Sequence, residues 1–308
     1  MTFQLFCELL LISLMIRSLR YYPHELFAVC ELNHMLEEAV SIVDQRVPMP
    51  HLQEPDYTAA IVTDFVNMAQ HSRAFARARL GGSYIHQRPK VTFDYNGVPK
   101  TCELGDLLVL CRRIVDGESR FNAALMQLKM AQGKNYPTIT NNGDQVQLYL
   151  YTQWPKFKCA NGIEYDIQPK IVTLGAQYMF VNPWEYPLFT HHIPQRKMPN
   201  EDYLSFGRFL YDFVNWQNGR PIVDVSLKDT DSWSQLIWDI IEHNKNAYFR
   251  RRNIGVNQGN RDVFDFLVDI RSNHEDLGSD FPNDPQLETE GMACPILFID
   301  YAEPQERE

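Results

Sequence analysis

Apolar residues recur at helical spacing in two stretches near the start of the chain. The first, residues 25–43, predicts an amphipathic helix with an apolar stripe of Leu26, Val29, Leu32, Met35, Leu36 and Val40. A second helix is expected over residues 57–79, because Asp56 can cap its start and Gly81-Gly82 can end it. Two helices are therefore expected before the first strand.

Three short segments with the composition and bounds of buried strands come next. They cover residues 90–95, 104–111 and 124–130. The Asn96-Gly97 pair favours a hairpin between the first two, and a short helix is expected over 144–153. This order of helix, three strands and helix predicts an α/β (α+β) fold.

The second half of the chain repeats both patterns. Strands are expected at residues 163–172, 177–181 and 294–301. Aromatic stripes at helical spacing predict one helix from Asn200 and another from Asp231, and such stripes usually form core. No clear linker divides the chain, so we expect an N-terminal helical segment (1–55) and one α/β domain (56–308) with an acidic loop at 272–290.

Two of the expected strands carry polar groups that a buried strand does not need. Asp106 lies at the start of one, and Gln127 and Lys129 lie within another. Residues two apart on a strand point to the same face, so Gln127 and Lys129 project together. A buried ammonium group needs a partner, and Asp106 is the nearest one if the two strands pair. An acid, an amide oxygen and a lysine at one strand edge can hold a divalent cation and a water.

This pattern resembles the PD-(D/E)XK nuclease superfamily, in the Gln-x-Lys form of Mrr-type restriction endonucleases. The resemblance covers about residues 88–155 and implies a restriction endonuclease-like core, a mixed central sheet flanked by helices, with further helices at both ends. It makes Asp106 the metal carboxylate, Gln127 a ligand through its amide oxygen, and Lys129 the cation that activates the attacking water. Mg²⁺, or Mn²⁺ in its place, is the implied cofactor. Gln127 replaces the commoner acid and removes one negative ligand.

Three more polar residues are candidates for this site. Glu103 either points into it or caps the strand in solvent, and Gln147 is expected to contact phosphate from the helix that follows. Related nucleases often place an acid on the first helix of the core. Asp64 is the acid within the expected 57–79 helix.

The distribution of charge favours a nucleic-acid partner more than the net charge of −10 suggests. Ten acids and one arginine lie in residues 273–308, so that segment carries −9 and the rest of the chain −1. Basic residues gather ahead of the expected catalytic strands, and phosphate binding needs local rather than overall positive charge. We expect DNA contacts from Arg73, Arg77, Arg79 and Arg88. A second basic group consists of Lys245, Arg250, Arg251, Arg252 and Arg261. Both groups can equally be solvated helix ends.

The cysteines and the N-terminus favour a cytoplasmic protein that does not enter a membrane. The six cysteines are scattered without a Cys-x-x-Cys pair, which is typical of free thiols in a reducing compartment. Residues 1–16 are apolar but contain Glu8 and are too short to span a bilayer, so a buried first helix is expected there.

The leading hypothesis is therefore a metal-dependent nuclease that hydrolyses DNA phosphodiester bonds, in the bacterial defence or restriction setting that the resemblance implies. The alternative is a catalytically inactive nuclease-fold subunit that binds nucleic acid or a partner protein of a defence system. A third hypothesis is a globular protein whose charged strand pair is purely structural. An oligomer is compatible with all three.

Overall fold

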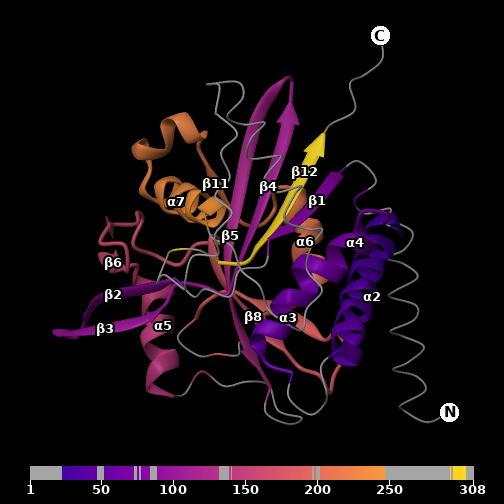
Figure 1. Ribbon diagram of the computed structural model, residues 1–308, viewed down its shortest axis with the longest axis horizontal. Coiled ribbons are helices and arrows are strands. Elements are labelled where there is room, and N and C mark those ends of the chain that lie inside the picture. The colour runs from indigo at the N-terminus through magenta and orange to yellow at the C-terminus, as the bar shows by residue number, and fades with distance from the viewer. Residues whose placement is uncertain are drawn as a thin grey trace.

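The fold is a layered α/β arrangement around a mixed, open eight-stranded sheet (Figure 1). The computed structural model describes residues 23–46, 52–72, 75, 78–83, 89–131, 139, 141–195, 198, 202–246, 292 and 294–302. Helices α2, α3, α4 and α6 lie on one face of the main sheet. Helices α5 and α7 and a smaller antiparallel sheet cover the other face.

The described helices and strands have the following bounds. The helices are α2 (Pro23–Arg46), α3 (Glu54–Ala60), the π-helix η1 (Ile61–Phe65), α4 (Val66–Ala69), α5 (Asn142–Gln153), α6 (Phe206–Val214), the 3₁₀-helix η2 (Val225–Thr230) and α7 (Ser232–Asn246). The strands are β1 (Ala78–Ser83), β2 (Lys90–Tyr95), β3 (Val98–Glu103), β4 (Leu107–Val115), β5 (Glu118–Met130), β6 (Phe157–Cys159), β7 (Glu164–Tyr165), β8 (Ala176–Val181), β9 (Phe189–His192), β10 (Tyr203–Ser205), β11 (Arg220–Ile222) and β12 (Ile296–Ala302).

The main sheet has the order β1-β12-β4-β5-β8-β9-β10, and β11 pairs with β5 outside this path. Strands β4 and β5 form an antiparallel hairpin, β8 is parallel to β5, and β12 is parallel to β4. The smaller sheet has the order β3-β2-β6-β7. None of the described helices is both long and apolar enough to cross a lipid bilayer.

Alternation along the central strands divides the core into two layers. On β4, Leu107 and Val109 pack with α2 and α6, whereas Leu108 and Leu110 pack with α5 and α7. Strand β5 alternates in the same way, with Met126 and Leu128 in the α2 layer. Because side chains alternate with a period of two, Gln127 and Lys129 face the α5 layer. The prediction that Gln127 and Lys129 project to the same face is confirmed.

The helix expected over 57–79 is wrong at its C-terminal end. Helical structure ends at Ala69, and Gly81-Gly82 lies in strand β1 instead of ending a helix. A Cβ atom on Gly82 would stand 1.7 Å from the carbonyl oxygen of Val62. Glycine is therefore needed for close packing of β1 on η1, a role that its position in the sequence does not reveal.

The Asn96-Gly97 turn is confirmed, but the strand predicted to pair across it, residues 104–111, is not the one that does so. Both residues have positive φ, 55° and 81°, and the turn joins β2 to β3, pairing Tyr95 with Val98. A two-residue turn requires pairing to resume at once, so the partner is residues 98–103 and not 104–111. Strand β4 pairs instead with β5 through a second turn of the same kind, Asp116-Gly117.

Two predictions in the second half needed adjustment, and a third strand is now placed in a sheet. The strand expected over 163–172 is reduced to β7, and the helix expected from Asn200 begins at Phe206, where Ser205 accepts a hydrogen bond from the Arg208 amide. The strand expected at 294–301 is β12, inside the main sheet. The described residues do not include 1–22 or 247–291. The buried first helix and the acidic loop at 272–290 therefore stay predictions.

A buried carboxylate ties three neighbouring strands together. Asp300 on β12 lies opposite Arg112 on β4 and Arg79 on β1. The Arg112 guanidinium donates to both carboxylate oxygens, each at 2.8 Å, and Arg79 donates to one of them at 2.6 Å. Arg112 is buried, whereas the Arg79 side chain is 75% exposed. The two arginines should therefore contribute differently to stability.

We expect Asp300→Asn to lower the free energy of unfolding by about 2–4 kcal/mol, because it leaves the buried Arg112 guanidinium without a charged partner. Arg79→Ala should cost less than about 1 kcal/mol, since exposed ion pairs contribute little. Urea unfolding of both variants measures the difference. Equal losses of unfolding free energy in the two variants would show that burial of an ion pair does not determine how much it stabilises the protein.

Candidate functional site

The predicted site residues meet where β4 begins and β5 approaches its end. Asp106 comes directly before β4, and the next residue, Leu107, pairs with Met126. The Asp106 amide donates to the Met126 carbonyl at 2.8 Å, which continues the hairpin by one residue. This register places Asp106 beside Gln127.

The Asp106 carboxylate is held by two donors from β5. Its Oδ2 accepts the backbone N–H of Leu128 at 2.8 Å and also the side-chain amide Nε2 of Gln127. Asp106 is 8% exposed and Gln127 is fully buried. The two residues predicted as metal ligands are therefore in contact, as donor and acceptor.

The orientation of the Gln127 amide is set by a chain of hydrogen bonds that begins at a backbone carbonyl. The Gln147 amide nitrogen, on α5, donates to the Glu103 carbonyl at 2.9 Å and to the Gln127 amide oxygen. A carbonyl can only accept, so Gln147 must present its NH₂ group there. Gln127 must then turn its oxygen to Gln147 and its NH₂ group to Asp106. Both Gln147 protons are thus donated within the protein, and its expected contact with phosphate stays a prediction.

The ion partner of Lys129 is not the one expected from the sequence. Its Nζ lies 2.9 Å from the carboxylate of Asp144, in the first turn of α5, and both side chains retain some exposure. Burial alone would lower the pKa of Lys129, but Asp144, with Glu54 and Asp106, raises it above its usual value. Lys129 is therefore a stable cation at the rim of the site.

The negative charges of two other acids act on the Asp106 carboxylate. Burial, together with the nearby charges of Glu54 and Glu103, raises the pKa of Asp106 to about 7 against the opposing effects of the Leu128 hydrogen bond and Lys129. The charge of Glu103 therefore acts on Asp106, and whether its side chain points into the site stays a prediction. A buried acid among other acids has a strong electrostatic preference for a cation.

Glu54 and Asp144 are the two acids of this region that the sequence analysis missed as site residues. Glu54 opens α3, three residues before the start that was expected from Asp56 as a cap. Asp56 is instead the third residue of the helix, where its carboxylate accepts a hydrogen bond from the backbone N–H of Gln53 at 2.9 Å. An acid followed by proline is typical of a first helical turn and could have located Glu54. Asp144 lies one turn before Gln147, so the two share a helix face.

The remaining candidates have other contacts or lie outside the described residues. Asp64 is buried in η1, where it accepts a hydrogen bond from Thr63. Arg79 lies on β1 beside Asp300, roughly 20 Å along the strands from the start of β4 at the usual rise per residue. Arg73, Arg77 and Arg88 are not among the described residues, so their contact with DNA stays a prediction.

The donor chemistry of the site fits Mg²⁺ in part. Among the described residues, no three His, Cys, Asp or Glu side chains converge in a metal-binding cluster. Mg²⁺ needs fewer protein ligands, since it commonly uses one or two carboxylates together with waters and substrate phosphates. Asp106 supplies one such carboxylate, and Glu54 and Glu103 are near enough for their charges to raise its pKa. Gln127 does not supply a ligand, because its amide presents a donor to Asp106.

Comparison with protein-family models, with curated proteins and with solved structures found no match for this chain. The fold is therefore described as a mixed α/β fold with an open eight-stranded sheet and a small antiparallel sheet. Function has to be inferred from the site, because a fold class alone does not determine activity.

We expect Asp106→Asn to stabilise the protein at pH 8. The folded-state pKa of about 7 lies above the unfolded value of about 4, so the wild type loses stability as pH rises between these values. Asparagine cannot ionise, and its oxygen can still accept from Leu128 and Gln127. The expected gain is about 1–4 kcal/mol at pH 8 and shrinks toward pH 5.

Thermal unfolding of both proteins across this pH range measures the effect. The control is Asp229→Asn, which removes one charge from an exposed position on η2. A gain that does not depend on pH, or an equal gain in the control, would contradict the burial of an ionisable carboxyl at position 106.

Proposed function

We propose that this chain is a metal-dependent nuclease that hydrolyses DNA phosphodiester bonds, built on a restriction endonuclease-like core. The observation that carries the proposal is the meeting of Asp106, Lys129 and further acids at one end of the β4–β5 hairpin. The sequence predicted the approach of Asp106 to the strand that carries Gln127 and Lys129, but not the further acids. A purely structural ion pair would not need the additional acids, which raise the pKa of Asp106.

The order of elements around the hairpin also supports the proposal. Helices α3 and α4 are followed by β1, by the β4–β5 hairpin, by the crossover helix α5 and by β8 parallel to β5. That is the helix, three strands and helix order of the resembled core, with β1 in place of the strand expected over residues 90–95. Two departures are the β2–β3 excursion before β4 and the insertion of β12 between β1 and β4.

The residues of the site would have distinct roles in this reaction. Asp106, with Glu54 or Glu103, would hold Mg²⁺, which supplies positive charge at a phosphodiester oxygen and a more acidic water. Lys129 places a cation where negative charge develops on the phosphate. Gln127 acts as a positioning residue, because it donates to Asp106 and fixes the direction of its carboxylate.

A second function, nucleic-acid or partner binding without cleavage, is favoured by one specific observation. The hydrogen-bond chain from Glu103 through Gln147 and Gln127 to Asp106 is complete and buried, so Gln127 has no amide oxygen directed at a cation beside Asp106. Such a closed arrangement suits a retained fold whose catalysis has been lost. The DNA cleavage and binding measurements given below distinguish the two functions. A role in bacterial defence, a defence-system partner and a cytoplasmic location are further parts of the proposal that depend on the resemblance.

We expect the wild-type protein to cleave plasmid or linear DNA when Mg²⁺ or Mn²⁺ is added, and not in the presence of a chelator. Asp106→Asn should reduce the rate by at least about a hundredfold, because the central carboxylate is lost while its hydrogen bonds are kept. Lys129→Met should reduce it by about ten- to a hundredfold, the range for a group that stabilises developing charge. Gel assays over a range of metal concentrations measure all three proteins.

The Asp229→Asn protein serves again as the control and should cleave at the wild-type rate. If folded wild-type protein binds DNA but does not cleave it with either metal, the nuclease proposal fails and the binding function replaces it. Unchanged cleavage by folded Asp106→Asn would remove Asp106 from the site.

A further expectation concerns Gln127→Glu, which restores the commoner acid. The new carboxylate cannot donate to Asp106 and repels it, so without metal the melting temperature should fall by several degrees. Mg²⁺ or Mn²⁺ should restore much of this loss and stabilise the variant more than the wild type. Thermal melts with and without metal provide a readout that is independent of cleavage. A loss that neither metal reverses would indicate a closed structural core.

A further inference from the structure

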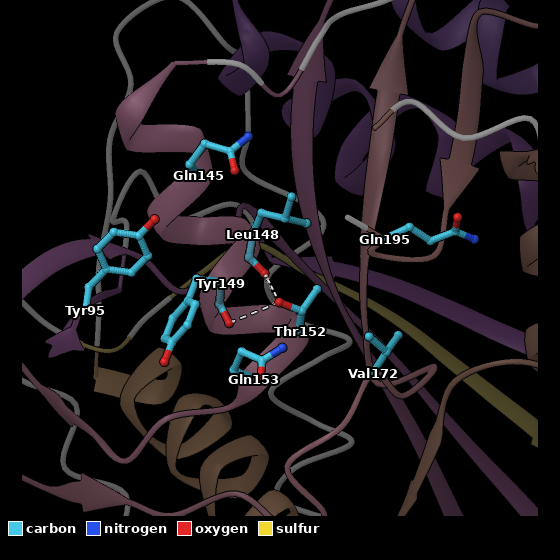
Figure 2. A pocket seen from close by; sticks show the side chains of 8 residues that line it. All are labelled: Tyr95, Gln145, Leu148, Tyr149, Thr152, Gln153, Val172 and Gln195. Atoms are coloured by element: carbon cyan, nitrogen blue, oxygen red, sulfur yellow. Dashed lines mark hydrogen bonds between the residues drawn. The ribbon is translucent and has the colours of Figure 1, made fainter. Parts of the chain in front are cut away.

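A polar and aromatic pocket lies beside the candidate site on helix α5, and the roles proposed above do not use it. It has a volume of about 390 Å³, within the usual range for small-molecule sites. Figure 2 shows that its lining comes from α5, from Tyr95 at the end of β2, and from Val172 and Gln195 in two loops.

The candidate site and the pocket face two adjacent stripes of side chains on α5. Asp144 and Gln147 face the site, as does Tyr151, whose hydroxyl donates to the Leu104 carbonyl at 2.6 Å. The pocket is lined by the next stripe of the helix, which consists of Gln145, Leu148, Tyr149 and Thr152. Neighbouring stripes of one helix lie within its diameter of about 10 Å. The pocket and the candidate site therefore lie on neighbouring faces of α5.

The aromatic part of the pocket is a corner of two tyrosine rings. Tyr95 and Tyr149 lie 5.0 Å apart between ring centroids, with their planes at 89°. Tyr149 is in turn stacked on the buried Phe93, at 6.1 Å and 16°. This support fixes the Tyr149 ring, while both tyrosines remain partly exposed. A planar ring can pack in such a corner with little ordering of the protein.

The polar part of the pocket consists of neutral amides. Gln145, Gln153 and Gln195 line the pocket, Gln195 on the side away from the tyrosines, and none of the lining residues carries a charge (Figure 2). Gln145 donates to the Ile139 carbonyl at 2.5 Å. Within the described part of the chain, no side chain or carbonyl is hydrogen bonded to the Gln153 or Gln195 amides or to the Tyr95 or Tyr149 hydroxyls. These groups are available to a ligand.

We propose that this pocket binds an unpaired nucleobase of the strand that occupies the candidate site. A base is planar and neutral, stacks on aromatic rings, and offers the mixed donors and acceptors that glutamine amides match. A phosphate group would require charge, which the lining lacks. The inference rests on the proposed function for the neighbouring site, and it adds recognition of a single-stranded or locally opened segment of DNA.

The test measures binding without cleavage, in the Asp106→Asn background. Fluorescence anisotropy gives the affinity for a short labelled single-stranded oligodeoxynucleotide and for the same strand with abasic positions. We expect tighter binding of the strand with bases. Adding Tyr95→Ala should weaken that binding about tenfold, since base–aromatic stacking is worth about 1–3 kcal/mol per base by alanine substitution. Tyr95→Phe, which keeps the ring, should bind within about twofold of its parent.

Trp184→Ala is the matched control, because Trp184 is an exposed aromatic residue that does not line the pocket. It should leave affinity for the strand unchanged. A second measurement does not depend on any pocket variant. Photo-cross-linking of a strand that carries 5-iodouracil, followed by mass spectrometry, should label Tyr95 or Tyr149.

The outcomes separate this inference from the proposed function. Equal affinity for intact and abasic strands, or cross-links confined to other residues, would overturn the base pocket even if the wild type cleaves DNA. Base-dependent binding that requires the Tyr95 ring would support the pocket even if the wild type shows no cleavage with Mg²⁺ or Mn²⁺.

Discussion

The pairing register of β4 with β5 is the constraint on which the rest of the structure depends. Leu107 opposite Met126 places Asp106 beside Gln127, and it sends alternate residues of both strands into two different core layers. A shift of one residue would move the apolar set of each strand to the wrong face and would separate the polar groups. The Asp116-Gly117 turn, with both residues at positive φ, sets this register from the closed end of the hairpin. The same register thus determines both the core and the candidate site.

The site combines a chain of hydrogen bonds with only one possible direction and a buried carboxylate that lies near other negative charges. A backbone carbonyl at one end and a carboxylate at the other leave the two glutamine amides a single orientation, so the Asp106 carboxylate is held in place before any ligand arrives. Fixed groups that need no rearrangement are useful in catalysis. The nearby charges of Glu54 and Glu103 raise the pKa of Asp106, which is the opposite of what a purely stabilising network would do. Local rules of stability are usually broken where function requires it.

Much of this could be predicted from residue patterns, and the failures have physical causes. Alternation and turn chemistry placed β2, β5 and β8, and they brought Asp106 next to Gln127, because these signals are local. Gly82 was misread because its role is contact with Val62, which is remote in the sequence. Lys129 was assigned to Asp106 because strand pairing was considered without the crossover helix, which brings Asp144 within 2.9 Å. The pocket could not be predicted, since its lining joins one strand, one helix and two loops.

The position of β12 has a consequence for how the molecule is made. This strand lies between β1 and β4, although almost two hundred residues separate it from β4 in the chain. During synthesis, β1 and β4 emerge early but must wait for the segment that joins them. Pairings between such remote segments are slow to form, because a long loop must close first. Until then both strands expose unpaired edges, which are prone to aggregation and to engagement by chaperones. The sheet that carries the site is therefore completed only after ribosomes have translated the last described strand.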